Sequence, residues 1–261
     1  MTVVSVTAPD QVNLVSGGAI LDDGVDANRI TASGATLSAG TGIGTGAANG
    51  EVDTAVATLT ASGSNGSVFL GEVDAVTLSS ITAAGAGNDV TVTNAAGDMT
   101  VVSVSAPDAA VLTATTGAVL DDAANATRIV AGTAPINAGL GIGAAGANNE
   151  IDTTVVTLFA VAAAGSVNVG ETDGITLQNV SAAGAGNDVT VINAAGNMTL
   201  VSVTATDQVN LTASVGSILD DDVNGTVISA AGTTLTAGAA IGATGANSQL
   251  DTTVATLTAN A

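Results

Sequence analysis

The run Val90-Thr91-Val92-Thr93-Asn94-Ala95-Ala96-Gly97-Asp98 decides the fold class of this chain. Valine and threonine alternate with a period of two residues, which is the pattern of a β-strand with one buried face. The residues from Asn94 to Asp98 supply turn chemistry, including a glycine for a positive-φ position. Short strands of this kind, separated by similar turns, recur along the sequence, and we find no convincing amphipathic helix.

The sequence repeats itself with a period of 99 residues. Ile43, Ile142 and Ile241 are spaced by this interval, as are the acidic and glycine-rich segments around them. Self-similarity at a fixed period is typical of repeat architectures. We therefore divide the chain into one unit of residues 1–98, a second of residues 99–197 and a partial third of residues 198–261, which together form one continuous structure.

Composition predicts a thin and elongated core. The chain is 46% hydrophobic, but it has no Trp or Tyr, only two Phe, and 33 Gly. Small branched side chains must therefore fill a narrow interior. Because the chain contains no Cys, disulfides and thiolate metal sites are excluded.

These features predict an all-β fold, a parallel β-helix (β-solenoid) in which each unit of about 99 residues makes about five coils of roughly 20 residues. At ~4.8 Å per coil, a unit would be about 24 Å long. An immunoglobulin-like sandwich for each unit is the alternative, which the absence of a buried Trp or a Cys pair disfavours. The residues that we expect to point inward are Val90, Val92, Leu59, Leu78, Leu112 and Leu158.

Charge excludes several classes of partner. The sequence has 23 acidic and 2 basic residues, a formal net charge of -21, which repels phosphate backbones and anionic lipid headgroups. We therefore expect no nucleic-acid partner. Polar residues and glycine interrupt every apolar stretch before it reaches the roughly 18 residues of a membrane span, so we expect no membrane insertion. The sequence from Met1 shows no signal peptide.

Adjacent carboxylates are the first candidates for a ligand site. They occur at Asp22-Asp23, Asp121-Asp122 and Asp220-Asp221-Asp222, and pairs spaced by two residues occur at Glu72 with Asp74 and at Glu171 with Asp173. Such groups suit a hard cation such as calcium, but the sequence lacks both the EF-hand spacing and a calcium-binding nonapeptide repeat. We interpret them as solvated turns with weak calcium binding as the alternative, and we assign no metal-site or cofactor-binding residues.

The same inventory argues against an enzyme. Acid/base chemistry by paired carboxylates or by a β-helical polysaccharide lyase needs partners that this chain lacks, because it has no His, Lys or Tyr. Arg29 and Arg128 occupy one repeat position, which is Val227 in the third unit. We predict that these arginines lie on the surface near the Asp pairs and that the chain has no catalytic residues.

Three further features have structural interpretations. The elements Gly42-Ile43-Gly44 and Gly141-Ile142-Gly143 lack the context of a phosphate loop, so we interpret them as turns around an inward isoleucine. Phe69 and Phe159 break the repeat, because they match Asn168 and Thr60. Both fall on outward strand positions, where we expect either ordinary exposure or a contact with a neighbouring chain.

The chain resembles the tandem repeats of large bacterial surface adhesins of the filamentous haemagglutinin type. The runs that carry the resemblance are GAILDD (18–23), TLSAGTGIGTGAANGEVDTAVATLTA (36–61) and AAGAGNDVTV (83–92), with their later copies. The resemblance implies a right-handed parallel β-helix, export to the cell surface and a role in attachment or extracellular structure. The chain departs from the family pattern in that we identify no signal peptide, secretion-recognition domain or membrane anchor in it, so the sequence does not indicate an export route.

We therefore expect a non-catalytic structural or adhesive segment of a long extracellular bacterial β-solenoid. The first alternative is a self-assembling extracellular filament subunit that stacks end to end, because an open solenoid end is an exposed strand edge. The second is an ice-binding or mineral-binding face built from outward threonines, which the irregular threonine register disfavours. Self-association, end to end or side by side, is the partner that the sequence favours.

Overall fold

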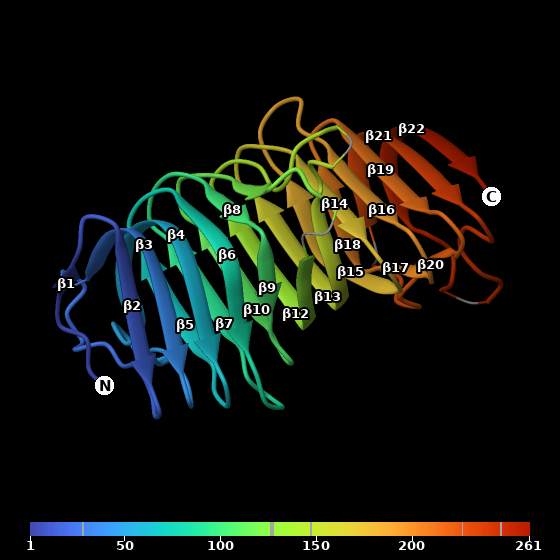
Figure 1. Cartoon of the computed structure of the whole chain (residues 1–261). Coiled ribbons are helices and arrows are strands. Elements are labelled where there is room, and N and C mark those ends of the chain that lie inside the picture. Colours follow the sequence, from blue (N-terminus) through green and yellow to red (C-terminus); the bar gives the residue numbers. More distant parts are fainter. Residues whose placement is uncertain (28, 126–127, 147, 226, 246) are drawn as a thin grey trace.

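The computed structural model describes residues 1–27, 29–125, 128–146, 148–225, 227–245 and 247–261. These residues form strands and turns without a helix, and successive strands pair in parallel to make about 11 turns of a β-solenoid. Figure 1 shows the turns stacked along one axis, with the N-terminus at one end of the stack and the C-terminus at the other. The predicted β-solenoid is confirmed.

The described residues form 22 strands, and the strands that pair with each other come mostly from adjacent turns of the solenoid. Their bounds are β1 (Val6–Thr7), β2 (Gln11–Ser16), β3 (Ile30–Ala39), β4 (Val52–Gly63), β5 (Val68–Glu72), β6 (Val76–Ala83), β7 (Val90–Asn94), β8 (Met99–Val101), β9 (Ser103–Ser105), β10 (Ala110–Ala114), β11 (Val119–Asp121), β12 (Arg128–Ala138), β13 (Ile151–Ala162), β14 (Val167–Glu171), β15 (Ile175–Ala182), β16 (Val189–Asn193), β17 (Met198–Leu200), β18 (Ser202–Ala205), β19 (Gln208–Ala213), β20 (Ile218–Asp220), β21 (Val227–Ala237) and β22 (Thr252–Asn260).

Two ladders of inward side chains define two walls of the solenoid, and each coil crosses one wall and then the other. The first wall carries the ladder Ile30, Thr54, Glu72, Asn94, Ala114, Ala138, Ala162 and Ala182. The second wall carries the ladder Leu37, Ala61, Ile81, Val104, Ile129, Thr153, Glu171, Asn193, Ala213 and Ala237. Pairing along each ladder keeps one set of side chains in the core, and the register shifts between β4 and β6 and between β13 and β15 leave this set inward.

The sequence unit and the coil do not coincide. Along the first wall, four turns lead from Thr54 to Ala138 and a fifth leads to Ala162. A step of 99 residues from Thr54 reaches Thr153, which lies in the second wall. A unit therefore spans about four and a half coils where we expected about five, which makes it about 22 Å long at ~4.8 Å per coil. Successive copies of any residue consequently alternate between the two walls.

One continuous apolar core runs through the stack. The six residues predicted to point inward are all fully buried, with exposed fractions of 0%. Ile43 and Ile142 are likewise fully buried between their glycines, and Gly44 has the positive φ of 64° that its turn requires. Phe69 and Phe159 alternate with buried neighbours and are half-buried on the outer surface, so their predicted outward positions are confirmed.

Candidate functional site

Three consecutive rungs of the first wall are polar although they face the core. Thr54, Glu72 and Asn94 pair in register from β4 to β5 and from β5 to β7, and none is more than 2% exposed. Buried polar groups of this kind need hydrogen-bond partners. We call this set the polar triad. Its copy in the second wall consists of Thr153, Glu171 and Asn193.

The Glu72 carboxylate is enclosed by donors from two coils. Its Oε2 accepts hydrogen bonds from the Thr54 hydroxyl at 2.7 Å and from the Val56 N–H at 3.2 Å, both on β4. Its Oε1 accepts hydrogen bonds from the Val73 N–H at 2.9 Å and from the Asp74 N–H at 3.4 Å, both in the turn after β5. The carboxylate therefore ties one coil to the next.

The copy has the same geometry. Glu171 accepts hydrogen bonds from the Thr153 hydroxyl at 2.7 Å, from the Val155 N–H at 3.2 Å and from the Thr172 N–H at 2.8 Å. Burial raises the pKa of both glutamates above the usual range, although their hydrogen bonds act in the opposite direction. The structure thus corrects our interpretation of Glu72 and Glu171 as open turn residues, since only their neighbours Asp74 and Asp173 are exposed.

Asn94 and Asn193 complete the triads and close the next turns. The Asn94 Nδ2 donates to the Gly97 carbonyl at 2.9 Å, and the Asn193 Nδ2 donates to the Gly196 carbonyl at 3.2 Å. Side-chain bonds of this kind stabilise turns by replacing a backbone partner. The triads therefore hold successive coils and their turns together.

A second group of acidic side chains lies on the outside of β4. Asp53 is only 9% exposed, and it stands beside Gly71 of the next coil, where a β-carbon would lie 2.7 Å from the Asp53 Oδ1. Burial, followed by the charges of Asp22, Glu51 and Asp26, raises the pKa of Asp53 to about 7, and Arg29 lowers it by a smaller amount. We call Asp22, Asp26, Glu51 and Asp53 the acidic cluster.

The copy of the acidic cluster is centred on Asp152. Burial and then the charges of Asp121 and Glu150 raise the pKa of Asp152 to about 6, while Arg128 lowers it. Arg128 is exposed at the start of β12, and Arg29 is half-buried before β3. Both arginines therefore lie at the surface near the acidic cluster or its copy, as predicted.

The first carboxylate of each Asp pair accepts a backbone hydrogen bond within its own turn. The Asp22 Oδ2 accepts a hydrogen bond from the Gly24 N–H at 2.6 Å, and the Asp121 Oδ2 accepts one from the Ala123 N–H at 2.6 Å. In the third unit the Asp220 Oδ2 accepts one from the Asp222 N–H at 2.9 Å. Among the described ranges, no group of three or more His, Cys, Asp or Glu side chains is arranged to hold a metal ion, and weak calcium binding by these turns stays a prediction.

The third residue of each Asp turn gives a prediction about stability. Gly24 has a φ of 80°, and its copy Ala123 has a φ of 63°, a conformation that costs an L-residue about 1–2 kcal/mol. Nothing lies within 4 Å of a β-carbon built on Gly24, so backbone strain alone separates the two residues. We expect Ala123→Gly to raise the free energy of unfolding by about 1 kcal/mol and Gly24→Ala to lower it by a similar amount.

Urea unfolding of the two variants, followed by circular dichroism, checks this prediction. An Ala123→Gly variant that is less stable than the parent would show that the positive φ is not what limits this turn.

Two shallow hollows on the outer surface are also copies of each other. One measures about 330 Å³ and is lined by residues that include Thr45, Glu51, Phe69 and Thr91. The other measures about 170 Å³ and includes Asn168 and Ile192 in the places of Phe69 and Thr93. The half-coil offset puts their floors on different walls. Among the lateral hollows of the described residues, these two form a pair that repeats with the sequence unit.

The outward row beside the first ladder is chemically mixed. From β7 to β21 it runs through Thr93, Thr113, Asn137, Val161, Ser181, Thr204 and Ser229. A flat threonine array is therefore not formed there, and an ice-binding face gains no support from this row.

The inward position of the triad residues was predictable from the strand alternation. Val68, Leu70 and Glu72 share one parity of the strand alternation, as do Val90, Val92 and Asn94, so the same rule that buries the valines also buries the glutamate and the asparagine. No comparable local signal marks Asp53, because the neighbouring charges at Asp22 and Asp26 come from the previous coil.

Comparison with known proteins gives no relative on which to base a function: no family model, no curated protein and no solved structure matches the chain. The resemblance to filamentous haemagglutinin-type adhesins therefore stays a prediction. Among the described residues there is also no helix of the length and apolarity needed to cross a bilayer.

Proposed function

We propose that this chain is a non-catalytic structural or adhesive segment of a long extracellular bacterial β-solenoid. The proposal rests on the buried carboxylates, which hold successive coils together. Glu72 and Glu171 each bind donors from two successive coils. A continuous core with such ties between coils suits a protein that transmits force or spans a distance.

The lateral surface supports the adhesive part of the proposal. The hollows beside Phe69 and Asn168 recur with the sequence unit, and repeated weak contacts gain strength by acting together. The acidic character of the chain favours a partner that is neutral or basic at its surface. The location that follows from this role is the extracellular space or the cell surface.

End-to-end assembly into filaments is the second candidate, because among the described residues β22 pairs with β21 alone and its Leu257 is 52% exposed. Electron microscopy of the purified chain separates the two candidates. A spanning segment gives rods about 53 Å long for its 11 turns, whereas a filament subunit gives continuous fibres.

Adhesion is tested with two sets of beads. One set carries the chain, and the other carries a scrambled sequence of the same composition at the same surface density. Under flow over cultured cells, collagen-coated glass and bare glass, we expect the folded chain to retain more beads on at least one surface. Equal retention on all three surfaces would contradict the adhesive role, and a compact particle in the micrographs would contradict the spanning role.

A further inference from the structure

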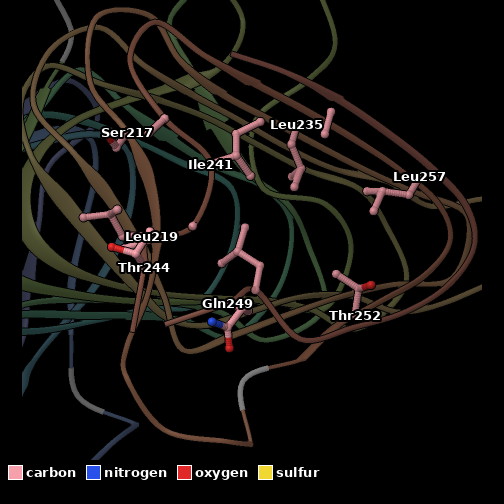
Figure 2. A pocket seen from close by; sticks show the side chains of 13 residues that line it. Ser217, Leu219, Leu235, Ile241, Thr244, Gln249, Thr252 and Leu257 are labelled. Atoms are coloured by element: carbon pink, nitrogen blue, oxygen red, sulfur yellow. The ribbon is translucent and has the colours of Figure 1, made fainter. Parts of the chain in front are cut away.

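The inner face of the last coil is open where its two earlier copies are covered. Leu257 on β22 is 52% exposed, while Leu59 and Leu158 at the same repeat position are 0% exposed. Thr252 is half-buried, while Thr54 and Thr153 are fully buried. A hollow of about 720 Å³ opens at this end, and Figure 2 shows that Leu235, Ile241 and Leu257 surround it.

The structure shows twice what covers this surface. Over the first copy, β5 and β6 pair with β4, so that Leu70 faces Val52 and Leu78 faces Leu59. Over the second copy, β14 and β15 pair with β13, so that Val169 faces Ile151. The covering segment in both cases is a short strand that begins with Val and ends in Gly-Glu, then a turn, and then a strand that begins with a β-branched residue followed by Thr and Leu.

The glutamate of that segment is the recognition element. Glu72 reaches the Thr54 hydroxyl and the Val56 N–H, and Glu171 reaches the Thr153 hydroxyl and the Val155 N–H. The third unit keeps the same sequence at these places, Thr252 and Val254. The backbone acceptor is also conserved between copies, because the Thr54 carbonyl binds the Val73 N–H at 3.2 Å and the Thr153 carbonyl binds the Thr172 N–H at 3.1 Å.

We propose that the edge of β22 binds a further solenoid coil that carries the pattern of residues 163–182, and that the glutamate of this coil completes a third polar triad on Thr252. The partner pairs in parallel with β22, places its branched residues over Leu250 and Leu257, and fills the hollow. Strand addition of this kind derives affinity from main-chain hydrogen bonds and specificity from alternate side chains.

A second copy of this chain, offering its first coil, matches the edge less well. Residues 1–24 contain no glutamate. Their copies Met99–Val101 and Met198–Leu200 pair with Val76–Leu78 and Ile175–Leu177 inside the solenoid, which are different coils from the one that ends at β22. Which coil the β22 edge accepts is independent of whether the lateral surface is adhesive.

The test uses the full chain and a synthetic peptide of residues 163–182. We expect saturable 1:1 binding by calorimetry and slower amide hydrogen exchange in β22. Leu257→Asp should weaken binding at least tenfold, and Thr252→Val or a peptide with Glu171→Ala should weaken it about threefold to tenfold. Val15→Asp, at a 73% exposed side chain on β2, is the matched control and should leave binding unchanged.

A second test fuses a copy of residues 163–182 to the chain after Ala261. Because the segment is then covalently attached, the result does not depend on the affinity of a free peptide. Protection of the β22 amides in the fusion, but not in a fusion with the scrambled segment, supports the proposal. Unprotected β22 amides in the fusion overturn it. The unfused chain could instead form multimers that Leu257→Asp abolishes and that the peptide does not compete with. This result would also overturn the proposal, because it would identify a second copy as the occupant. Bead retention measures lateral contacts and not this edge, so the two failures are distinguishable.

Discussion

Leu158→Ala should lower the free energy of unfolding by about 2–5 kcal/mol, whereas Leu257→Ala should lower it by less than about 0.5 kcal/mol. The two leucines occupy the same repeat position, but Leu158 is 0% exposed between β12 and β15 and Leu257 is 52% exposed on β22. Alanine at position 158 leaves a cavity in a narrow core of small side chains, which have few ways to close it.

Urea unfolding combined with hydrogen exchange measures this difference, because coils of a solenoid can open separately. The amides of β12, β13 and β15 should lose most protection in Leu158→Ala. Equal costs at the two positions would mean that stacking on β22 already buries Leu257 in solution.

The stability of the fold should decrease as the pH rises from about 4 to about 8. The pKa of Asp53 is raised to about 7 and that of Asp152 to about 6 in the folded chain, so the folded state holds these protons to a higher pH than the unfolded state. Their contribution is complete below the ordinary aspartate range and is lost as the pH passes about 6 and then about 7. After allowance for solvent screening, we expect a loss of about 1–2 kcal/mol for each group.

Urea midpoints measured at intervals of one pH unit check this prediction. Asp53→Asn and Asp152→Asn should each flatten the curve. Asp251→Asn is the matched control, because it removes one charge at the exposed copy in the third unit and so reports general repulsion in a chain of net charge -21. If Asp53→Asn and Asp251→Asn change the slope equally, repulsion over the whole surface and not burial governs the pH dependence.

The alternation of apolar and polar residues predicted most of this fold. Leu59 and Val90 are inward and Phe69 is outward because parity along a strand fixes the face. The half-coil offset could not be predicted in this way, since it depends on turn lengths that vary from coil to coil. Thr54 meets its partner Glu72 eighteen residues later, while Ser103 meets Arg128 only after twenty-five.

The candidate site was predicted less well than the fold. We grouped Glu72 with the open acidic turns because adjacent charges are usually solvated, although its parity placed it inward. Asp53 lies against Gly71 of the next coil and near the charges of Asp22 and Asp26 from the previous coil, and no local pattern reports such contacts. Sequence reasoning therefore failed for two reasons: the parity of Glu72 was not applied, and the environment of Asp53 is decided by long-range stacking and not by the local strand pattern.

The alternation of copies between the two walls sets the valency of an array of such units. A flat surface that touches one wall meets only every second copy of a given hollow, at intervals of nine coils or about 43 Å. The intervening copies face the other side, where a second surface or a neighbouring rod can engage them at the same spacing. A repeat of four and a half coils thus makes a two-sided tether from a single sequence motif, whereas a repeat of a whole number of coils would present every copy to one side.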